Sequence, residues 1–168
     1  MSVTPEIIER GEQPYVAIRA EVTMQQLAGL GERLGEVLGW LAAHDLAPAG
    51  PPFFRYNVID MERQLEVEAG VPVAAAITGG DQLVAGVLPA GRYVTAIHVG
   101  HPDGLVGAVA GLLDWAAGQG LQWDMQQTAD GERWGSRLEI YLTDPSEEPD
   151  MSKWETQLAF RLAGRGQA

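Results

Sequence analysis

The segment WLAAHDL (residues 40–46) matches WAAGQGL (residues 115–121), and this match decides the fold because it marks an internal repeat. Each segment ends a helical stretch in which apolar residues recur at spacings of three and four. Around both segments the order of elements is the same: one strand before the helix and two strands after it. Aromatic residues also match between the halves: Tyr15 with Tyr93, Trp40 with Trp115, and Tyr56 with Tyr141. The sequence therefore predicts two fused strand–helix–strand–strand modules.

The repeat leads to an α+β fold in which one antiparallel sheet carries the helices on one face. The predicted strands are residues 14–22, 53–60 and 64–75 in the first half, and residues 92–100, 137–144 and 155–163 in the second. Repeat one spans about residues 4–76 and repeat two about residues 82–163, joined by a glycine-rich linker at 77–91. We expect a single domain over residues 1–168.

Composition excludes several classes of function. The chain of 168 residues has a formal net charge of −12, with Lys153 as its only lysine, so we expect no binding to nucleic acid. It has no apolar run of the roughly 18 residues that span a membrane and no signal peptide. The absence of cysteine suits a cytoplasmic protein. The three histidines are scattered and no phosphate loop is present, so we expect no metal and no cofactor.

Strand faces point to a binding site. In RLEIYLTDP (residues 137–145), Leu138 and Ile140 lie on one side of the strand, and Glu139 and Tyr141 lie on the other. One helix per module covers only one sheet face. We assign Leu138 and Ile140 to that face, so the opposite face becomes a groove with aromatic walls. The residues assigned to the groove face are Tyr15, Ala17, Tyr93, Thr95, Phe54, Tyr56, Arg137, Glu139 and Tyr141.

Plainer interpretations stay open for several of these residues. Glu139 and Tyr141 also fit an exposed strand face with a polar pair, and Trp40 and Trp115 also fit core packing. Residues 122–136 have no counterpart of equal length in the first half. We expect them to form an extra hairpin or a lid, because their tryptophans, Trp123 and Trp134, argue against disorder.

Two motifs carry a family resemblance: L-P-A-G-x-Y at residues 88–93, and Glu-x-Tyr followed by Asp-Pro at residues 139–145. Over about residues 4–163 the chain resembles the GyrI-like small-molecule-binding family, related to effector-binding domains of AraC- and MerR-type multidrug regulators. The resemblance implies that the two modules are related by a pseudo-two-fold axis. It also implies a central ligand groove in which Glu139 meets lipophilic cations. No DNA-binding segment precedes the domain, so we expect a stand-alone member. Some such members sequester drugs, and others hydrolyse cyclopropane-bearing alkylating natural products.

The favoured function is therefore the binding of lipophilic, aromatic, often cationic small molecules, which would serve xenobiotic resistance. The candidate ligand-binding residues are Glu139, Tyr141, Trp134, Tyr56, Phe54, Tyr93 and Trp123. The alternative is a detoxifying hydrolase that opens cyclopropane-bearing substrates. In that enzyme Glu139 would activate water, and Tyr141 would donate to the developing oxygen charge. A role in protein interaction is a third possibility.

Overall fold

In both halves of the chain a strand, a helical segment and two strands of the main sheet follow in the predicted order, and the second half adds a hairpin after its helix. The computed structural model describes residues 4–60, 62–77 and 83–164. Residues 78–82 of the predicted linker, and with them the predicted start of repeat two, lie outside this part. The strands are β1 Glu6–Arg10, β2 Gln13–Val22, β3 Phe53–Ile59, β4 Leu65–Pro72, β5 Val84–Leu88, β6 Gly91–Val99, β7 Met125–Thr128, β8 Gly131–Trp134, β9 Arg137–Tyr141 and β10 Glu155–Arg161. The helices are α1 Leu27–Glu32, α2 Leu34–Ala43 and α3 Leu105–Gly118, with short 3-10 turns at Met24–Gln26, Pro102–Gly104 and Met151–Lys153.

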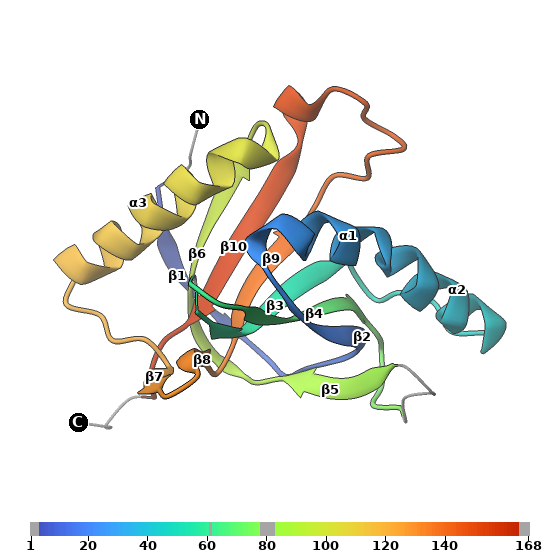
Figure 1. The fold of residues 1–168 in the computed structure, drawn as a ribbon, viewed down its shortest axis with the longest axis horizontal. Coiled ribbons are helices and arrows are strands. Elements are labelled where there is room, and N and C mark those ends of the chain that lie inside the picture. The colour runs from blue at the N-terminus through green and yellow to red at the C-terminus, as the bar shows by residue number, and fades with distance from the viewer. Residues whose placement is uncertain (1–3, 61, 78–82, 165–168) are drawn as a thin grey trace.

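The main strands form one curled antiparallel sheet in the order β1-β6-β10-β9-β3-β4-β2-β5 (Figure 1). In the first half, β4 lies between β3 and β2, and in the second half, β10 lies between β9 and β6. Read inward from one edge, the strands are β1, β6, β10 and β9. Read inward from the other edge they are β5, β2, β4 and β3, so corresponding strands of the two halves occupy corresponding places. The two halves meet where β3 pairs with β9, and this seam places residues of both halves side by side.

Each half also supplies an edge strand to the other. β1 lies at the start of the first half but pairs with β6 of the second, and β5 lies at the start of the second half but pairs with β2 of the first. Neither β1 nor β5 is among the strands that the sequence predicts. Both are short and partly exposed, and β5 lies in the segment predicted as a linker.

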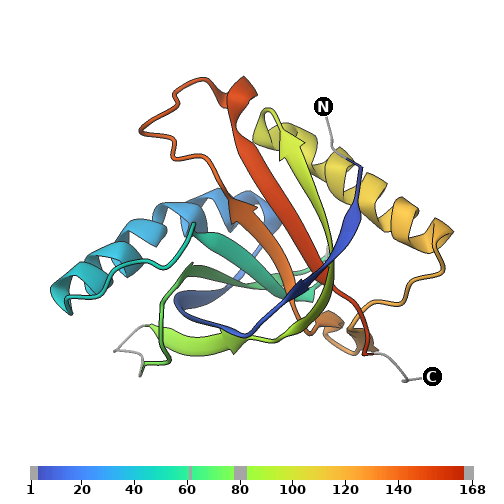
Figure 2. The same cartoon turned by 180° about the vertical axis from the view of Figure 1, so that it is seen from behind.

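Both helical segments cover the same face of the sheet (Figures 1 and 2). Leu30 of α1 and Val37 and Leu41 of α2 pack into an apolar cluster with the inner side chains of β2, β3 and β4. Leu112 of α3 packs into a second cluster with Val94, Leu158 and Phe160. Trp40 and Trp115 pack against the first and second cluster respectively, which confirms their assignment as core packing.

The opposite, concave face of the sheet has an apolar cluster of its own, and here one prediction was wrong. Leu138 and Ile140 were expected under the helices, but they pack on the concave face with Tyr15 and Tyr93. Phe54, Tyr56 and Tyr141 were expected on the concave face, but they belong with the helix-side cluster. Because the curled sheet buries apolar residues on both faces, alternation alone does not reveal which side faces the helices.

The segment 122–136 contains the hairpin predicted for it, formed by β7 and β8, and β8 adds to β3 at Val58 and Ile59. Trp134 is 5% exposed and packs with Trp123 and Phe160, at ring-centroid distances of 5.6 and 5.7 Å. The hairpin is thus fixed to the second-half core by its tryptophans. None of the helices in the described part of the chain has the length and apolar content to cross a bilayer.

Replacing Gly131 with alanine should destabilise the fold, because Gly131 has φ +123° and its Cβ would lie 2.4 Å from the carbonyl oxygen of Ile59. We expect the free energy of unfolding to fall by about 1–3 kcal/mol. Gly29→Ala is the control, since no atom lies within 4 Å of a Cβ at this helical glycine. That change should leave stability equal or raise it by up to about 1 kcal/mol. Urea denaturation followed by circular dichroism measures both, and a Gly131→Ala protein as stable as wild type would contradict the account.

Candidate functional site

Glu139 lies at the middle of the helix-side face, on the seam between the two halves. In the register of the sheet it stands opposite Phe54 of β3 on one side and Leu158 of β10 on the other. Phe54 belongs to the apolar cluster beneath α1 and α2, and Leu158 belongs to the cluster beneath α3. The carboxylate therefore sits between two apolar clusters, and the side chain remains partly exposed.

Two phenols hold the Glu139 carboxylate. The hydroxyl of Tyr141 donates to Oε1 of Glu139 at 2.9 Å, and the hydroxyl of Tyr56 also favours the charged form of this carboxylate. Burial raises the pKa of Glu139 above its usual value, while the two phenols and the nearby Arg137 charge act against that rise. Burial and the Glu139 charge in turn raise the pKa of both tyrosines well above 10, so they stay protonated as donors.

Aromatic rings surround this carboxylate. The rings of Phe54 and Tyr141 meet edge to face at 5.4 Å, and those of Phe54 and Tyr56 meet at 6.3 Å. Tyr141 is partly exposed, whereas Phe54 and Tyr56 are buried. The structure thus brings four of the predicted binding residues, Glu139, Tyr141, Tyr56 and Phe54, into one cluster. Within it, Tyr141 and Glu139 are the members that solvent reaches.

Arg137 is a site residue whose role the sequence analysis did not predict. Its guanidinium lies 4.7 Å from the ring centroid of Trp134 and 4.4 Å from that of Phe160. Arg137 is two residues from Glu139 on β9, so both side chains lie on the same face. Burial lowers the pKa of Arg137, but a guanidinium stays charged. Among the described residues, neither Arg137 nor Glu139 takes part in an ion pair. One feature of the sequence could have identified Arg137 as a site residue: the alternation of side chains along β9, which puts it on the same face as Glu139.

The remaining predicted residues lie elsewhere. Tyr93 is 1% exposed on the concave face, where its hydroxyl donates to the carbonyl of Pro89 at 2.7 Å. Tyr93 is therefore separated from Glu139 by the sheet, which corrects its assignment to the same group. Trp134 takes part through Arg137, while Trp123 supports Trp134 from within the core. Within the described residues, no group of three or more His, Asp or Glu side chains could hold a metal ion.

A family comparison agrees with this geometry. The profile of the GyrI-like small molecule binding domain matches residues 4–163. The chain belongs to this GyrI-like family. No curated protein matches the chain by sequence. The match covers both modules, the seam between them and the β7–β8 hairpin, so the hairpin lies within the family domain.

Solved structures share the fold. The EcmrR C-terminal domain is 20% identical, with a TM-score of 0.70, and the match covers 95% of this chain and 97% of that one. In an EcmrR–DNA complex the match has a TM-score of 0.75 and 21% identity, and it covers 95% of this chain and 57% of the EcmrR chain. SAV2435 bound to tetraphenylphosphonium is 9% identical, with a TM-score of 0.65, and the match covers 96% of this chain and 95% of the SAV2435 chain. A hydrolase from Listeria innocua is 15% identical, with a TM-score of 0.57, and the match covers 95% of this chain and 91% of the hydrolase chain.

Glu139→Gln should stabilise the fold at neutral pH and not in acid. A raised carboxyl pKa means that the folded protein holds the proton more tightly than the unfolded chain does. Wild type therefore loses stability as pH rises through this pKa, whereas glutamine has no charge to bury. The stability gained by the variant should be small near pH 4 and should grow toward pH 7. Urea denaturation of both proteins at the two pH values measures it, and an equal gain at both would show that ionisation of Glu139 is not responsible.

Proposed function

We propose that the protein binds lipophilic aromatic cations at the Glu139 cluster and thereby sequesters xenobiotics. The observation that carries the proposal is a partly buried carboxylate between two apolar clusters, beside two phenols, that has no ion-pair partner among the described residues. Such a carboxylate is poorly solvated, so a cation that replaces water beside it gains a strong electrostatic partner. The absence of cysteine is consistent with action in the reducing cytoplasm.

Arg137 supports the proposal because it already makes the contacts expected of such a ligand. It is a planar cation stacked on two aromatic rings, on the same strand face as Glu139. Glu139 lines neither the cavity beside Glu68 nor the smaller cavity beside Asp60 and Arg63. Arg137 already occupies the rings of Trp134 and Phe160, so a ligand that stacks on them has to displace it. We infer that Arg137 moves outward and that the ligand takes its place over Trp134.

The family membership and one neighbour support the ligand class. The family is described as a small-molecule-binding domain, and SAV2435 was solved bound to tetraphenylphosphonium, which is both aromatic and cationic. At 9% identity, SAV2435 shares a fold with this chain, so its ligand serves as a probe here.

Hydrolysis of cyclopropane-bearing alkylating compounds is a second candidate, favoured by the pKa of Glu139. A carboxylate whose pKa is raised by burial is a stronger base than an ordinary glutamate. The Tyr141 hydroxyl donates to Glu139 at 2.9 Å, and in the proposed reaction it turns from Glu139 to donate to an oxygen on the substrate. In this mechanism Glu139 takes a proton from water, the resulting hydroxide attacks a ring carbon, and the electron pair of the broken bond moves into the conjugated acceptor of the substrate.

Glu139→Gln should weaken binding of tetraphenylphosphonium, because the variant keeps the side-chain volume and removes the negative charge. If the Glu139 carboxylate and the bound phosphonium are withdrawn from water, the variant should lose about 2–5 kcal/mol of binding free energy. Isothermal titration calorimetry measures it, with tetraphenylborate as an anion of the same shape that should bind wild type more weakly than the cation does. Glu155→Gln, which removes one exposed charge from β10, is the matched control.

Tyr141→Phe separates the two candidate functions. A binding protein should keep most of its affinity, because the ring remains and only one hydrogen bond to Glu139 is lost. A hydrolase should lose turnover of a cyclopropane-bearing alkylator, followed by chromatography, in both the Tyr141→Phe and Glu139→Gln variants. Equal affinity of wild type and Glu139→Gln for the phosphonium, together with no turnover by wild type, would remove both candidates.

Arg137→Gln should strengthen binding of tetraphenylphosphonium, since it removes the internal cation from the rings and from the neighbourhood of Glu139. A stacked cation contributes about 0.5–2 kcal/mol, so we expect a gain of a few-fold to about thirtyfold. Arg33→Gln removes an exposed charge from the junction of α1 and α2 and controls for net charge. Weaker binding by Arg137→Gln than by Arg33→Gln would show that Arg137 supports the ligand and does not compete with it.

A further inference from the structure

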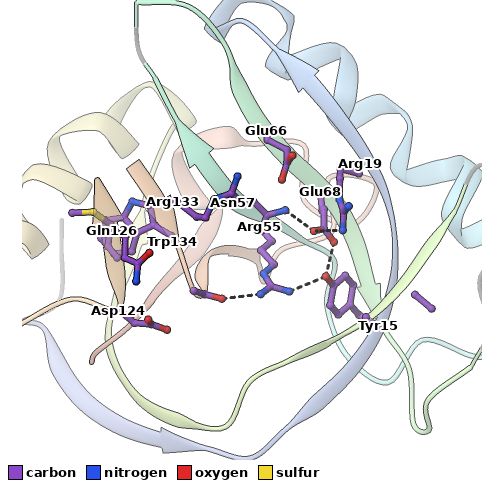
Figure 3. Close-up of a pocket in the computed structure, with 14 residues that line it drawn as sticks. Tyr15, Arg19, Arg55, Asn57, Glu66, Glu68, Asp124, Gln126, Arg133 and Trp134 are labelled. Carbon is purple, nitrogen blue, oxygen red and sulfur yellow. Dashed lines mark hydrogen bonds and ion pairs between the residues drawn. The ribbon is translucent and has the colours of Figure 1, made fainter. Parts of the chain in front are cut away.

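A separate polar cavity lies on the concave face, away from the helices and from Glu139. Its volume is about 550 Å³, within the range of about 300–1,000 Å³ typical of small-molecule sites. Side chains of β2, β3 and β4 form its floor, and the β7–β8 hairpin forms one wall (Figure 3). On β3, Arg55 alternates with Phe54 and Tyr56, so it points to the face opposite theirs. We call this space the concave-face cavity.

The floor is organised by a buried carboxylate, Glu68. The register of the sheet places Glu68 between Arg19 of β2 and Arg55 of β3, and its side chain is 1% exposed. Its oxygens accept hydrogen bonds from the Tyr15 hydroxyl and the Asn57 amide, and Arg19 lies 3.4 Å away (Figure 3). Glu68 thus has three partners within the protein. It holds the surrounding donors in place and is not itself available to a ligand.

Arg55 is held by neutral groups. It donates to the Tyr15 hydroxyl at 2.9 Å and to the carbonyl of Gly135 at 2.7 Å. Burial, with the Glu68 charge, raises the pKa of Tyr15 to about 12, so this phenol stays neutral at physiological pH. Arg55 therefore keeps its full positive charge at the cavity wall, in a fixed orientation. A guanidinium held in this way is already organised to bind an oxyanion.

The charged residues of the lining are three arginines and three acids, and Asp124 has its ion-pair partner, Arg161, outside the lining. Glu68 is paired with Arg19, and Asp124 is paired with Arg161 at 2.7 Å. In the described part of the chain, Arg55, Arg133 and Glu66 line the cavity without taking part in an ion pair. Two cations and one anion remain, although the whole chain has a formal charge of −12. The two arginines without an ion pair favour a ligand with a negatively charged group.

We propose that the concave-face cavity binds a small organic anion through a carboxylate or phosphate group. Arg55 and Arg133 bind the oxyanion, and Glu66 accepts a hydrogen bond from a hydroxyl or amine elsewhere on the ligand. The site differs from the Glu139 cluster in its face, its charge and its ligand class. A test of anion binding in this cavity is therefore independent of the function proposed for the Glu139 cluster.

The test is isothermal titration of the full-length chain with inorganic phosphate, with succinate, and with ethanolamine as a cation of similar size. We expect saturable binding of at least one anion and none of ethanolamine. Arg133→Gln should weaken anion binding by about tenfold, because a charge-assisted hydrogen bond to the ligand is lost. Arg133 is exposed on the hairpin, so this variant should fold normally, which circular dichroism confirms.

Two controls fix the location of binding. Arg33→Gln, with the same change of charge far from the cavity, and Glu139→Gln, on the other face, should both bind the anion as wild type does. Saturation by phosphate alone or by succinate alone identifies the preferred group, and either result supports the proposal. The proposal is overturned if neither anion binds up to about 10 mM, if Arg33→Gln weakens binding as much as Arg133→Gln, or if Glu139→Gln abolishes it.

Discussion

The pairing of β3 with β9 is the contact on which the rest of the structure depends. It is the junction at which the two halves join into one sheet, and it sets Phe54 opposite Glu139. A shift of one residue in this register would turn Glu139 to the concave face and bring Leu138 under the helices. The apolar side chains on both faces of the seam prevent such a shift. The position of the acidic group is therefore fixed by core packing, and not by the loops.

The sheet uses glutamate in two different ways on its two faces. Glu139 is held by phenols and has an arginine nearby without an ion pair, so its charge is left available. Glu68 is buried more completely, and its oxygens are occupied by Tyr15, Asn57 and Arg19. The first carboxylate is suited to receive a cation. The second is suited to hold arginines in place. The same residue type thus has different partners on the two faces: phenols on one, and a phenol, an amide and an arginine on the other.

Much of this arrangement could be read from the sequence. The repeat predicted the order of the main elements, and the Glu-x-Tyr spacing placed Glu139 and Tyr141 on one face. Other features depended on tertiary contacts that the local pattern does not encode. Leu138 and Ile140 look like residues that face a helix, yet they pack against Tyr15 and Tyr93 because the sheet curls over its concave side. Arg137 looks like a surface residue until Trp134 is brought beneath it by the hairpin.

The exchange of edge strands has a consequence for the order in which the protein assembles. Glu6 of β1 pairs with Thr95 of β6, so the first strand has no neighbour until more than half of the chain has been synthesised. Likewise β2 gains its outer neighbour only when β5 emerges. During translation the first module thus presents open strand edges, which are prone to pair with other chains. Closing these distant contacts also slows folding. For that reason, this protein is most exposed to aggregation when the ribosome has released the first module and the second is not yet made.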